Sequence, residues 1–333
     1  MRKEAEARQA LAELKGFAPV IPNQNILINA IALREAKESS AIENIITTQE
    51  ELYKDLTASS GIPDSATKEV INYRRAIYEG STLVKKRQII RIGDILKIQE
   101  IIVSNNAGIR RLPGTSLIND TTKKTVYIPP QDYREILDLL DNLCKYFNDS
   151  ENSLCKMALL HYQFECIHPF YDGNGRTGRI LNILYLLQKN YLDTPILYLS
   201  SYIIKNKNEY YALLQTTGKR MNYEPWILFI LRGIEETSKQ TLTKIREIKA
   251  LLESVSEMAK KKCPRIYSRE LLEIIFENPY SKIDFLVKKM NINRKTASKY
   301  LKELEAKKIL SSLPAGKEIL YINNSLMDVL KNP

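Results

Sequence analysis

The chain has 333 residues, of which 44% are hydrophobic and 27% charged, and its formal net charge is +11. These values are ordinary for a globular protein, and the length exceeds that of most single domains, so we expect more than one domain. No apolar run approaches the roughly 20 residues that span a bilayer, and the N-terminus lacks the apolar segment of a signal peptide, which predicts a cytoplasmic protein without a membrane partner.

The cysteines indicate the cellular compartment, and the charge distribution indicates the domain organisation. Cys144, Cys155, Cys166 and Cys263 show neither metal-ligand spacing nor the density of a disulfide framework, so we expect buried thiols in a reducing compartment. Residues 260–333 hold 16 Lys and Arg against 8 Asp and Glu, and so carry most of the net positive charge. This asymmetry predicts a separate C-terminal domain with an acidic partner.

The first 60 residues are predicted to be helical. Apolar residues recur at helical spacing over 4–15 and again over 25–56, and two prolines separate these stretches. Within the second stretch, Ser39 and Glu43 are four residues apart and share one face of a helix. Taken alone, the pair is typical of an exposed helical surface.

The middle of the chain combines helices with one expected hairpin. Helices are predicted at 65–85, 92–104, 130–147, 154–167, 180–189 and 225–251. Segments 116–118 and 125–128 have strand character and flank the polar turn 119–124, which predicts a β-hairpin. The expected fold class is therefore mainly α with a small hairpin.

The most informative stretch is 168–179, which reads His-Pro-Phe-Tyr-Asp-Gly-Asn-Gly-Arg-Thr-Gly-Arg. Gly173, Asn174 and Gly175 permit a tight or left-handed backbone that turns successive N–H groups toward one point. A helix is expected to follow, and its N-terminus adds to the attraction for an anion. The pattern indicates a phosphate site.

The charged residues of this stretch suit phosphate chemistry. Arg176 and Arg179 are three residues apart on the first turns of the helix, so their guanidiniums can hold two phosphates of a polyphosphate. Asp172 offers a hard oxygen ligand for Mg²⁺ beside those phosphates. His168 has an ordinary pKa near neutrality and can accept a proton at physiological pH.

Residues 168–179 match the Fic family signature, His-Pro-Phe-x-Asp/Glu-Gly-Asn-Gly-Arg-x-x-Arg, at every specified position. The resemblance implies a protein adenylyltransferase, which uses ATP and Mg²⁺ to transfer AMP to a Ser, Thr or Tyr hydroxyl of a target protein. It makes His168 the catalytic base and Asp172 the metal ligand. It also assigns nucleotide binding to Gly173, Asn174, Gly175, Arg176 and Arg179.

The stretch Ser39-x-x-x-Glu43-Asn44 is similar to the inhibitory motif of the same family, Ser/Thr-x-x-x-Glu-Gly/Asn. Its position upstream of the core resembles the class that carries its inhibitory helix at the N-terminus. The resemblance implies a restrained enzyme in which Glu43 pairs with Arg179 and takes the place of the γ-phosphate.

Two further segments resemble parts of that family. The predicted hairpin is similar to the Fic flap, which holds the target segment by strand pairing; the corresponding residues are Thr125, Val126, Tyr127 and Ile128. Tyr210 and Tyr211 lie in a segment similar to the one that closes over adenine. A hairpin without a docking role and aromatics that belong to the core are the alternatives. His161, the other histidine, is expected to be a core residue.

The C-terminal region is predicted to be a winged helix-turn-helix domain. Helices at 268–277, 282–290 and 293–308 precede strands at 309–312 and 318–322. Possible DNA contacts from the third helix and the wing are Arg294, Lys295, Ser298, Lys299 and Lys317. A solvated basic face and a protein-docking module remain the alternatives.

The sequence thus divides into an N-terminal segment with the inhibitory helix at 1–60, a Fic core at 61–251 and a winged-helix domain at 264–333. The expected partners are a target protein, the protein itself through automodification, DNA, and a second copy in a homodimer. Two other functions stay open: an enzyme that removes AMP or transfers another nucleotide-linked group, and a transcription regulator whose core senses ATP.

Overall fold

A computed structural model of the chain describes residues 2–57, 64–118, 123, 125–315 and 318–331. Helices dominate it, with two small antiparallel sheets, so the predicted mainly α fold class is confirmed. In chain order the elements are α1 Arg2–Phe17, the 3-10 helix η1 Ala18–Val20, α2 Gln24–Ile42, α3 Gln49–Thr57, α4 Ser65–Arg87, α5 Ile92–Val103, β1 Leu117–Ile118, β2 Thr125–Tyr127, α6 Tyr133–Asn148, α7 Leu154–Ile167, α8 Asn174–Gln188, α9 Ser200–Lys205, α10 Lys207–Arg220, α11 Glu224–Lys262, α12 Arg269–Glu277, β3 Tyr280–Ser281, α13 Ile283–Met290, α14 Arg294–Ala306, β4 Ser311–Ala315, β5 Glu318–Ile322 and α15 Asn324–Lys331. Across these residues, every helix is too short or too polar to cross a bilayer.

Short polar side chains start several of these helices where the sequence places them. Asp64 accepts a hydrogen bond from Thr67 N at the start of α4, and Asp132 accepts from the first turn of α6. Ser153 does the same for α7, the helix that leads into the glycine-rich stretch. Each cap satisfies backbone N–H groups that the helix itself leaves without partners.

Helices α4 and α8 form the centre of the core. α4 packs against α2, α5 and α8, and α7 lies on the other side of α8. At the α4–α8 crossing, a Cβ on Gly80 would lie 2.9 Å from Cδ1 of Leu184, so only glycine permits this close approach without a shift. The crossing fixes α8, whose N-terminus follows the glycine-rich loop.

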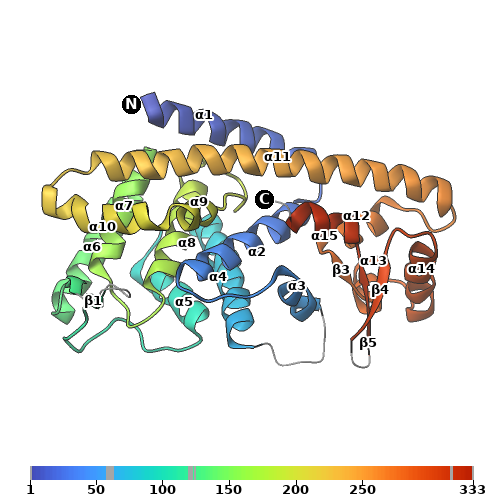
Figure 1. Cartoon of the computed structure of the whole chain (residues 1–333), viewed down its shortest axis with the longest axis horizontal. Helices are drawn as coiled ribbons and strands as arrows, with labels where there is room; N and C mark the ends of the chain where they lie inside the picture. Colours follow the sequence, from blue (N-terminus) through green and yellow to red (C-terminus); the bar gives the residue numbers. More distant parts are fainter. Residues whose placement is uncertain (1, 58–63, 119–122, 124, 316–317, 332–333) are drawn as a thin grey trace.

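The long helix α11 runs along the molecule, and α1 packs along one side of it (Figure 1). Trp226, near its start, is fully buried and donates a hydrogen bond from Nε1 to the carbonyl oxygen of Ala158 on α7. α11 continues to Lys262, beyond residue 251 where the sequence predicts that the core ends. One continuous helix therefore joins the central helices to the C-terminal part.

The C-terminal part contains α12, α13 and α14 and a three-stranded sheet in the order β3-β5-β4. It packs on the rest of the chain through α12, which lies against α2. Asn29 Nδ2 donates to the carbonyl oxygen of Glu277, and Asn23 Nδ2 donates to the carboxylate of the same residue. The N-terminal half of α2 is therefore fastened to the C-terminal part.

Several predicted element boundaries are wrong. The single helix expected over 25–56 is two helices, because α2 ends at Ile42 and Asn44 adopts a left-handed backbone with φ 63°. The helix expected from residue 180 already begins at Asn174. The hairpin is present, with Leu117 opposite Tyr127, although most of its turn lies outside the described residues. β3 and α15 were not predicted.

A buried carboxyl group joins α2 to two neighbouring helices. Glu35 accepts hydrogen bonds from Ser200 N (3.1 Å) and Ser200 Oγ (2.5 Å) at the start of α9, and from the hydroxyl of Tyr73 on α4. Burial raises the pKa of Glu35 to about 7, against the action of the Ser200 hydrogen bonds. The carboxyl group thus favours its neutral form in the folded protein.

We predict that this junction weakens as the pH rises from about 4.5 to about 7, because in that window only the unfolded state ionises Glu35 freely. The loss of unfolding free energy is on the order of 3 kcal/mol. The Glu35→Gln variant should show a flatter pH dependence of denaturant-induced unfolding. Glu100→Gln, an exposed control, should keep the wild-type slope, and equal slopes in all three proteins would contradict the assignment.

Candidate active site

The loop before α8 has the backbone that an anion site requires. Gly173 has φ 79°, a left-handed conformation, and a Cβ there would lie 2.9 Å from Cγ1 of Val103, so the position favours glycine for two reasons. Asn174 braces the loop: its Oδ1 accepts from Phe170 N at 2.9 Å and its Nδ2 donates to Phe170 O at 2.8 Å. The helix that begins at this braced turn has first N–H groups without intrahelical partners, and such groups attract an anion.

Two buried guanidiniums stand beside this turn. The side chains of Arg176 and Arg179 are 2% and 3% exposed. Arg176 Nη1 pairs with Glu69 Oε2 of α4 at 2.6 Å, and its Nη2 donates to Asp172 Oδ1 at 3.1 Å. Arg179 Nε donates to Ser39 Oγ at 2.7 Å. Buried cations of this kind demand anionic or carbonyl partners.

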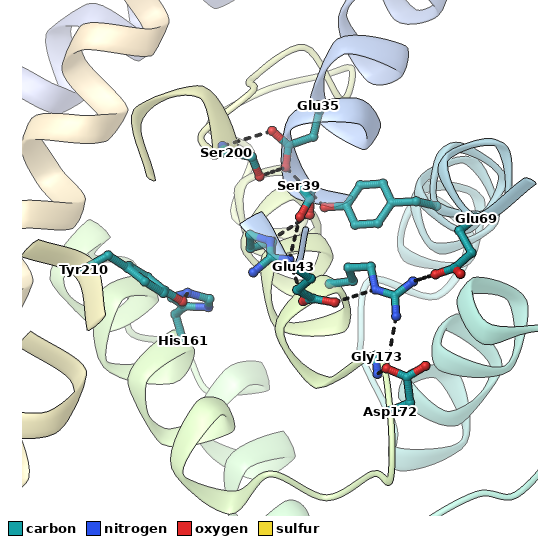
Figure 2. Close-up of polar contacts among 12 residues, drawn as sticks. Glu35, Ser39, Glu43, Glu69, His161, Asp172, Gly173, Ser200 and Tyr210 are labelled. Atoms are coloured by element: carbon teal, nitrogen blue, oxygen red, sulfur yellow. Dashed lines mark hydrogen bonds and ion pairs between the residues drawn. The ribbon is translucent and has the colours of Figure 1, made fainter. Parts of the chain in front are cut away.

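The Glu43 carboxylate bridges both arginines (Figure 2). Its Oε2 accepts from Arg176 Nε at 2.7 Å, and its Oε1 accepts from Arg179 Nη2 at 2.8 Å. The same Oε1 would lie only 2.6 Å from a Cβ on Gly175, so the carboxylate rests on the first turn of α8. The expected pair with Arg179 is present, and the contact with Arg176 adds to it.

The end of α2 explains how Glu43 reaches this position. Glu43 is the C-cap of α2, and Asn44 follows it with the left-handed φ of 63° that ends many helices. Asn tolerates this backbone better than most residues, which gives a physical reason for Asn or Gly after the glutamate. Ser39, one turn earlier on the same face, holds Arg179 through its hydroxyl and its carbonyl oxygen.

His168 is the C-cap of α7 and has a left-handed backbone, with φ 47° and ψ 58°. Its side chain is half-buried. Burial lowers the pKa of His168 to about 4, and the positive charge of Arg110 acts in the same direction. The imidazole is therefore neutral at physiological pH, the form that accepts a proton.

Asp172 projects from the loop with its side chain 65% exposed. Its Oδ1 accepts from Gly173 N at 2.6 Å as well as from Arg176, and the carboxylate faces solvent beside the anion site. Mg²⁺ in nucleotide sites is commonly held by one or two carboxylates and the substrate phosphates. Asp172 fits that role, while no group of three metal-binding side chains occurs among the described residues.

The hairpin lies next to the end of α7, which precedes His168. The hydroxyl of Tyr127, on β2, donates to the carbonyl oxygen of Cys166 near the end of α7 at 3.0 Å. Ile128, just after the strand, is 64% exposed, and Thr125 is also exposed, whereas Val126 is half-buried. Part of this strand is therefore exposed, next to the end of α7.

The two tyrosines expected at the adenine pocket differ in position. Tyr210 is 1% exposed and its hydroxyl is hydrogen-bonded to Nε2 of His161, which itself stacks on Trp226. These contacts place Tyr210 in the core, so its expected place on the pocket wall is not seen here. Tyr211 is 39% exposed. His161 has the core position that the sequence predicts.

The possible DNA contacts lie far along the molecule from α8, on α14 (Figure 1). Lys295 and Lys299 are exposed, and Ser298 is half-buried. Arg294 is also exposed, but its guanidinium pairs with Asp284 of α13 at 2.5 Å, which reduces its free positive charge. Lys317 lies outside the described residues.

Sequence reasoning missed two carboxyl groups of the site. Glu69 binds Arg176 from α4, and no local pattern reveals it. Glu165 lies one turn before His168, and burial raises its pKa to about 7. Its Oε1 would be 2.6 Å from a Cβ on Gly178, which shows how closely it approaches α8. Its spacing of three from His168 is the one signal that could have found it.

Three family models match the chain. The Fic/DOC family N-terminal model matches residues 1–82, the Fic/DOC family model matches residues 89–186, and the C-terminal domain model of protein adenylyltransferase SoFic-like proteins matches residues 251–326. A protein adenylyltransferase Fic from Aedes aegypti is 26% identical over 164 residues, 48% of this chain and 31% of that protein. One from Nematostella vectensis is 28% identical over 178 residues, 51% of this chain and 38% of that protein. The chain thus spans about a third of the length of these relatives.

Solved structures share the fold. A Fic family protein from Desulfovibrio desulfuricans superposes with a TM-score of 0.60 at 20% identity and covers 97% of this chain and 96% of that one. A Fic domain containing signaling protein from Bacteroides thetaiotaomicron gives a TM-score of 0.57 at 18% identity and covers 72% and 95% of the two chains. The solved structures show that the fold is shared. The two Fic/DOC models match residues 1–82 and 89–186, more than half of the chain between them, so the chain belongs to the Fic/DOC family.

Proposed function

We propose that the protein is an adenylyltransferase that transfers AMP from ATP to a Ser, Thr or Tyr hydroxyl of a target protein. The observation that carries the proposal is a neutral His168 beside a helix N-terminus at which two buried arginines converge. The relatives named protein adenylyltransferase support the same reaction class.

In the proposed reaction, the backbone of Gly173–Gly175 and the side chains of Arg176 and Arg179 hold the polyphosphate. His168 accepts the proton of the target hydroxyl as its oxygen forms a bond to the α-phosphorus. The bond to the β-phosphate oxygen breaks, and pyrophosphate leaves with that electron pair. Asp172 would hold a Mg²⁺ ion, which would neutralise charge on the phosphates.

We propose further that the protein is made in a restrained state. The Glu43 carboxylate uses the hydrogen-bonding groups of Arg176 and Arg179 that a nucleotide phosphate would use. The polyphosphate must then be excluded or shifted, and its α-phosphorus is no longer aligned with the target hydroxyl. Automodification is the expected consequence of releasing this restraint.

Other chemistries remain candidates for the same residues. Removal of AMP from a modified protein, or transfer of another nucleotide-linked group, would use the same base and phosphate site. A homodimer is compatible with each of these activities. We rank AMP transfer first because the named relatives favour it.

A second candidate function is nucleic-acid binding by a winged-helix-like C-terminal domain. The exposed lysines of α14, Lys295 and Lys299, and the adjacent β4–β5 hairpin favour it. In this reading the Fic core would be an ATP sensor attached to a transcription regulator.

The His168→Ala variant should lose AMP transfer by 10²-fold or more, because only the proton acceptor is removed. It should be measured in a Glu43→Gly background, where the proposed restraint is absent. Binding of ATP by calorimetry should stay within a few-fold, since the phosphate site is intact. Full-rate transfer by the double variant would refute the role of His168.

The Glu43→Gly variant should raise AMP transfer and automodification tenfold or more, roughly the effect of one lost charge-assisted contact. Glu43→Gln, which keeps the shape, should raise it less. Arg179→Ala should not activate, because that arginine also places the phosphates. The matched control is Glu38→Gln, whose carboxylate pairs with Arg34 instead. Assays with α-labelled ATP decide, and equal rates for Glu43→Gly and wild type would remove the inhibitory assignment.

If α14 binds DNA, affinity should fall steeply with salt because lysines release counterions from the phosphates. Full-length protein and a Lys295→Glu, Lys299→Glu double variant should be compared on a random duplex pool by fluorescence anisotropy. Binding that is absent, or equal in both proteins, would instead favour a protein-docking role.

A further inference from the structure

Arg110, between α5 and β1, is fully buried beside the catalytic loop. Its backbone N–H donates to the carbonyl oxygen of Pro169 at 2.9 Å, and Ile109 forms a β-bridge with Phe170. The segment before the hairpin therefore runs antiparallel to the loop that follows His168. This pairing places the Arg110 side chain against the C-terminal end of α7.

The guanidinium of Arg110 grips three carbonyl oxygens. Nε donates to His168 O at 2.8 Å, and Nη2 donates to Ile167 O at 3.4 Å and also to Pro130 O. Two of these acceptors are at the C-terminus of α7, where the helix leaves its carbonyls without partners. The third follows the hairpin.

Among the residues that the structure describes, no carboxylate pairs with Arg110, and its Nη1 is buried without a hydrogen-bond partner. A buried cation held by carbonyl dipoles alone is costly. Such an arrangement indicates that Arg110 serves something other than stability.

The contact with His168 O bears directly on the catalytic side chain. His168 has a left-handed backbone, with φ 47° and ψ 58°, which residues other than glycine and asparagine adopt at a cost. The hydrogen bond from Arg110 Nε fixes the direction of the His168 carbonyl and so opposes rotation to the ordinary right-handed backbone. The direction of the imidazole depends on this conformation.

The contact with Pro130 O connects His168 to the hairpin. Pro130 follows β2, and Tyr127 of that strand is separately bonded to Cys166 O. The planar guanidinium of Arg110 therefore joins Pro130, at the end of the hairpin, to the backbone of His168. A shift of the hairpin relative to α7 would break at least one of its hydrogen bonds.

We propose that Arg110 is a positioning residue, which sets the distance between the His168 imidazole and a hydroxyl presented at the hairpin. This inference rests on the proposed function for its effect on catalysis. It predicts that Arg110 contributes to the turnover step and not to nucleotide binding, since the carbonyl oxygens that its guanidinium contacts belong to Pro130, Ile167 and His168 and not to the loop Gly173–Gly175.

The test is Arg110→Lys in a Glu43→Gly background, because lysine keeps the charge but cannot hold three carbonyls in one plane. We expect kcat for AMP transfer to fall about 100-fold, the effect of a displacement near 1 Å, while KM for ATP stays within threefold. Arg111→Lys is the matched control: this neighbour is exposed, stacks on Tyr133, and should leave kcat unchanged.

A second measurement does not require activity. The chain has two histidines, so imidazole ¹⁵N spectra contain two sets of signals, and a His168→Ala spectrum assigns them. In Arg110→Lys the His168 signals should shift or broaden, while those of His161 stay unchanged. If Arg110→Lys does not fold, Arg110→Gln, which keeps a planar donor, replaces it.

The outcomes separate the ideas. Unchanged kcat with an unchanged His168 spectrum would overturn the proposal. Changes in both histidines with a lower melting temperature would make Arg110 a general structural residue, which also overturns it. If Glu43→Gly transfers no AMP at all, the proposed function fails, but the spectra still decide whether Arg110 orients His168.

Discussion

The structure depends on the ion pairs of two buried guanidiniums, which share the carboxylate of Glu43 while Arg176 also pairs with Glu69 and Asp172. Arg176 and Arg179 are almost fully buried, and Glu43 bonds to both. Removing one partner of a buried ion pair typically costs about 3–5 kcal/mol, because a charge is left without compensation. In the proposed function, Glu43 and a nucleotide phosphate would compete for the same N–H groups of Arg176 and Arg179.

Helix α2, which leads to Glu43, is hydrogen-bonded to its neighbours at its start, its middle and its end. Asn29 ties its N-terminal half to α12, Glu35 ties its middle to α9 and α4, and Ser39 with Glu43 ties its end to α8. The polar groups of these contacts are mostly satisfied inside the protein, so displacement of α2 as a whole would expose many of them at once. Rotation of the Glu43 side chain alone breaks far fewer bonds. Its position after the last turn of α2, followed by Asn44 in a left-handed backbone, makes that local change the easier one.

The loop before α8 was predictable from sequence because its conformation is local. Gly173 has a left-handed backbone, Asn174 braces the turn through its side chain, and the two arginines are placed by helical spacing, so twelve consecutive residues contain the information. The partners of those arginines are not local. Glu69 comes from another helix and is 107 residues away from Arg176 in the chain, so its contact depends on the α4–α8 packing.

Other failures have equally specific causes. The helix expected over 25–56 stops at Ile42 because one Asn with positive φ outweighs a continuing apolar pattern. Tyr210 is an aromatic residue of the kind that lines nucleotide pockets. Its hydroxyl is hydrogen-bonded to His161 and its ring packs on Trp226, so it lies in the core. No prediction was made for Arg110, because it is buried by the antiparallel pairing of its segment with Pro169 and Phe170, which no local pattern reveals.

The pKa of His168 reflects its burial and the charges of its neighbours. Burial and the nearby charge of Arg110 lower the pKa of His168 to about 4, which makes it a weak base on its own, while Glu43 acts in the opposite direction. A general base works best when its pKa is close to the working pH. In the proposed reaction a polyphosphate replaces Glu43 and brings more negative charge near the imidazole, which raises the pKa of His168 toward that range. The anion that aligns the reaction would then also strengthen its base, so a neutral His168 in the restrained state is compatible with proton acceptance in the productive one.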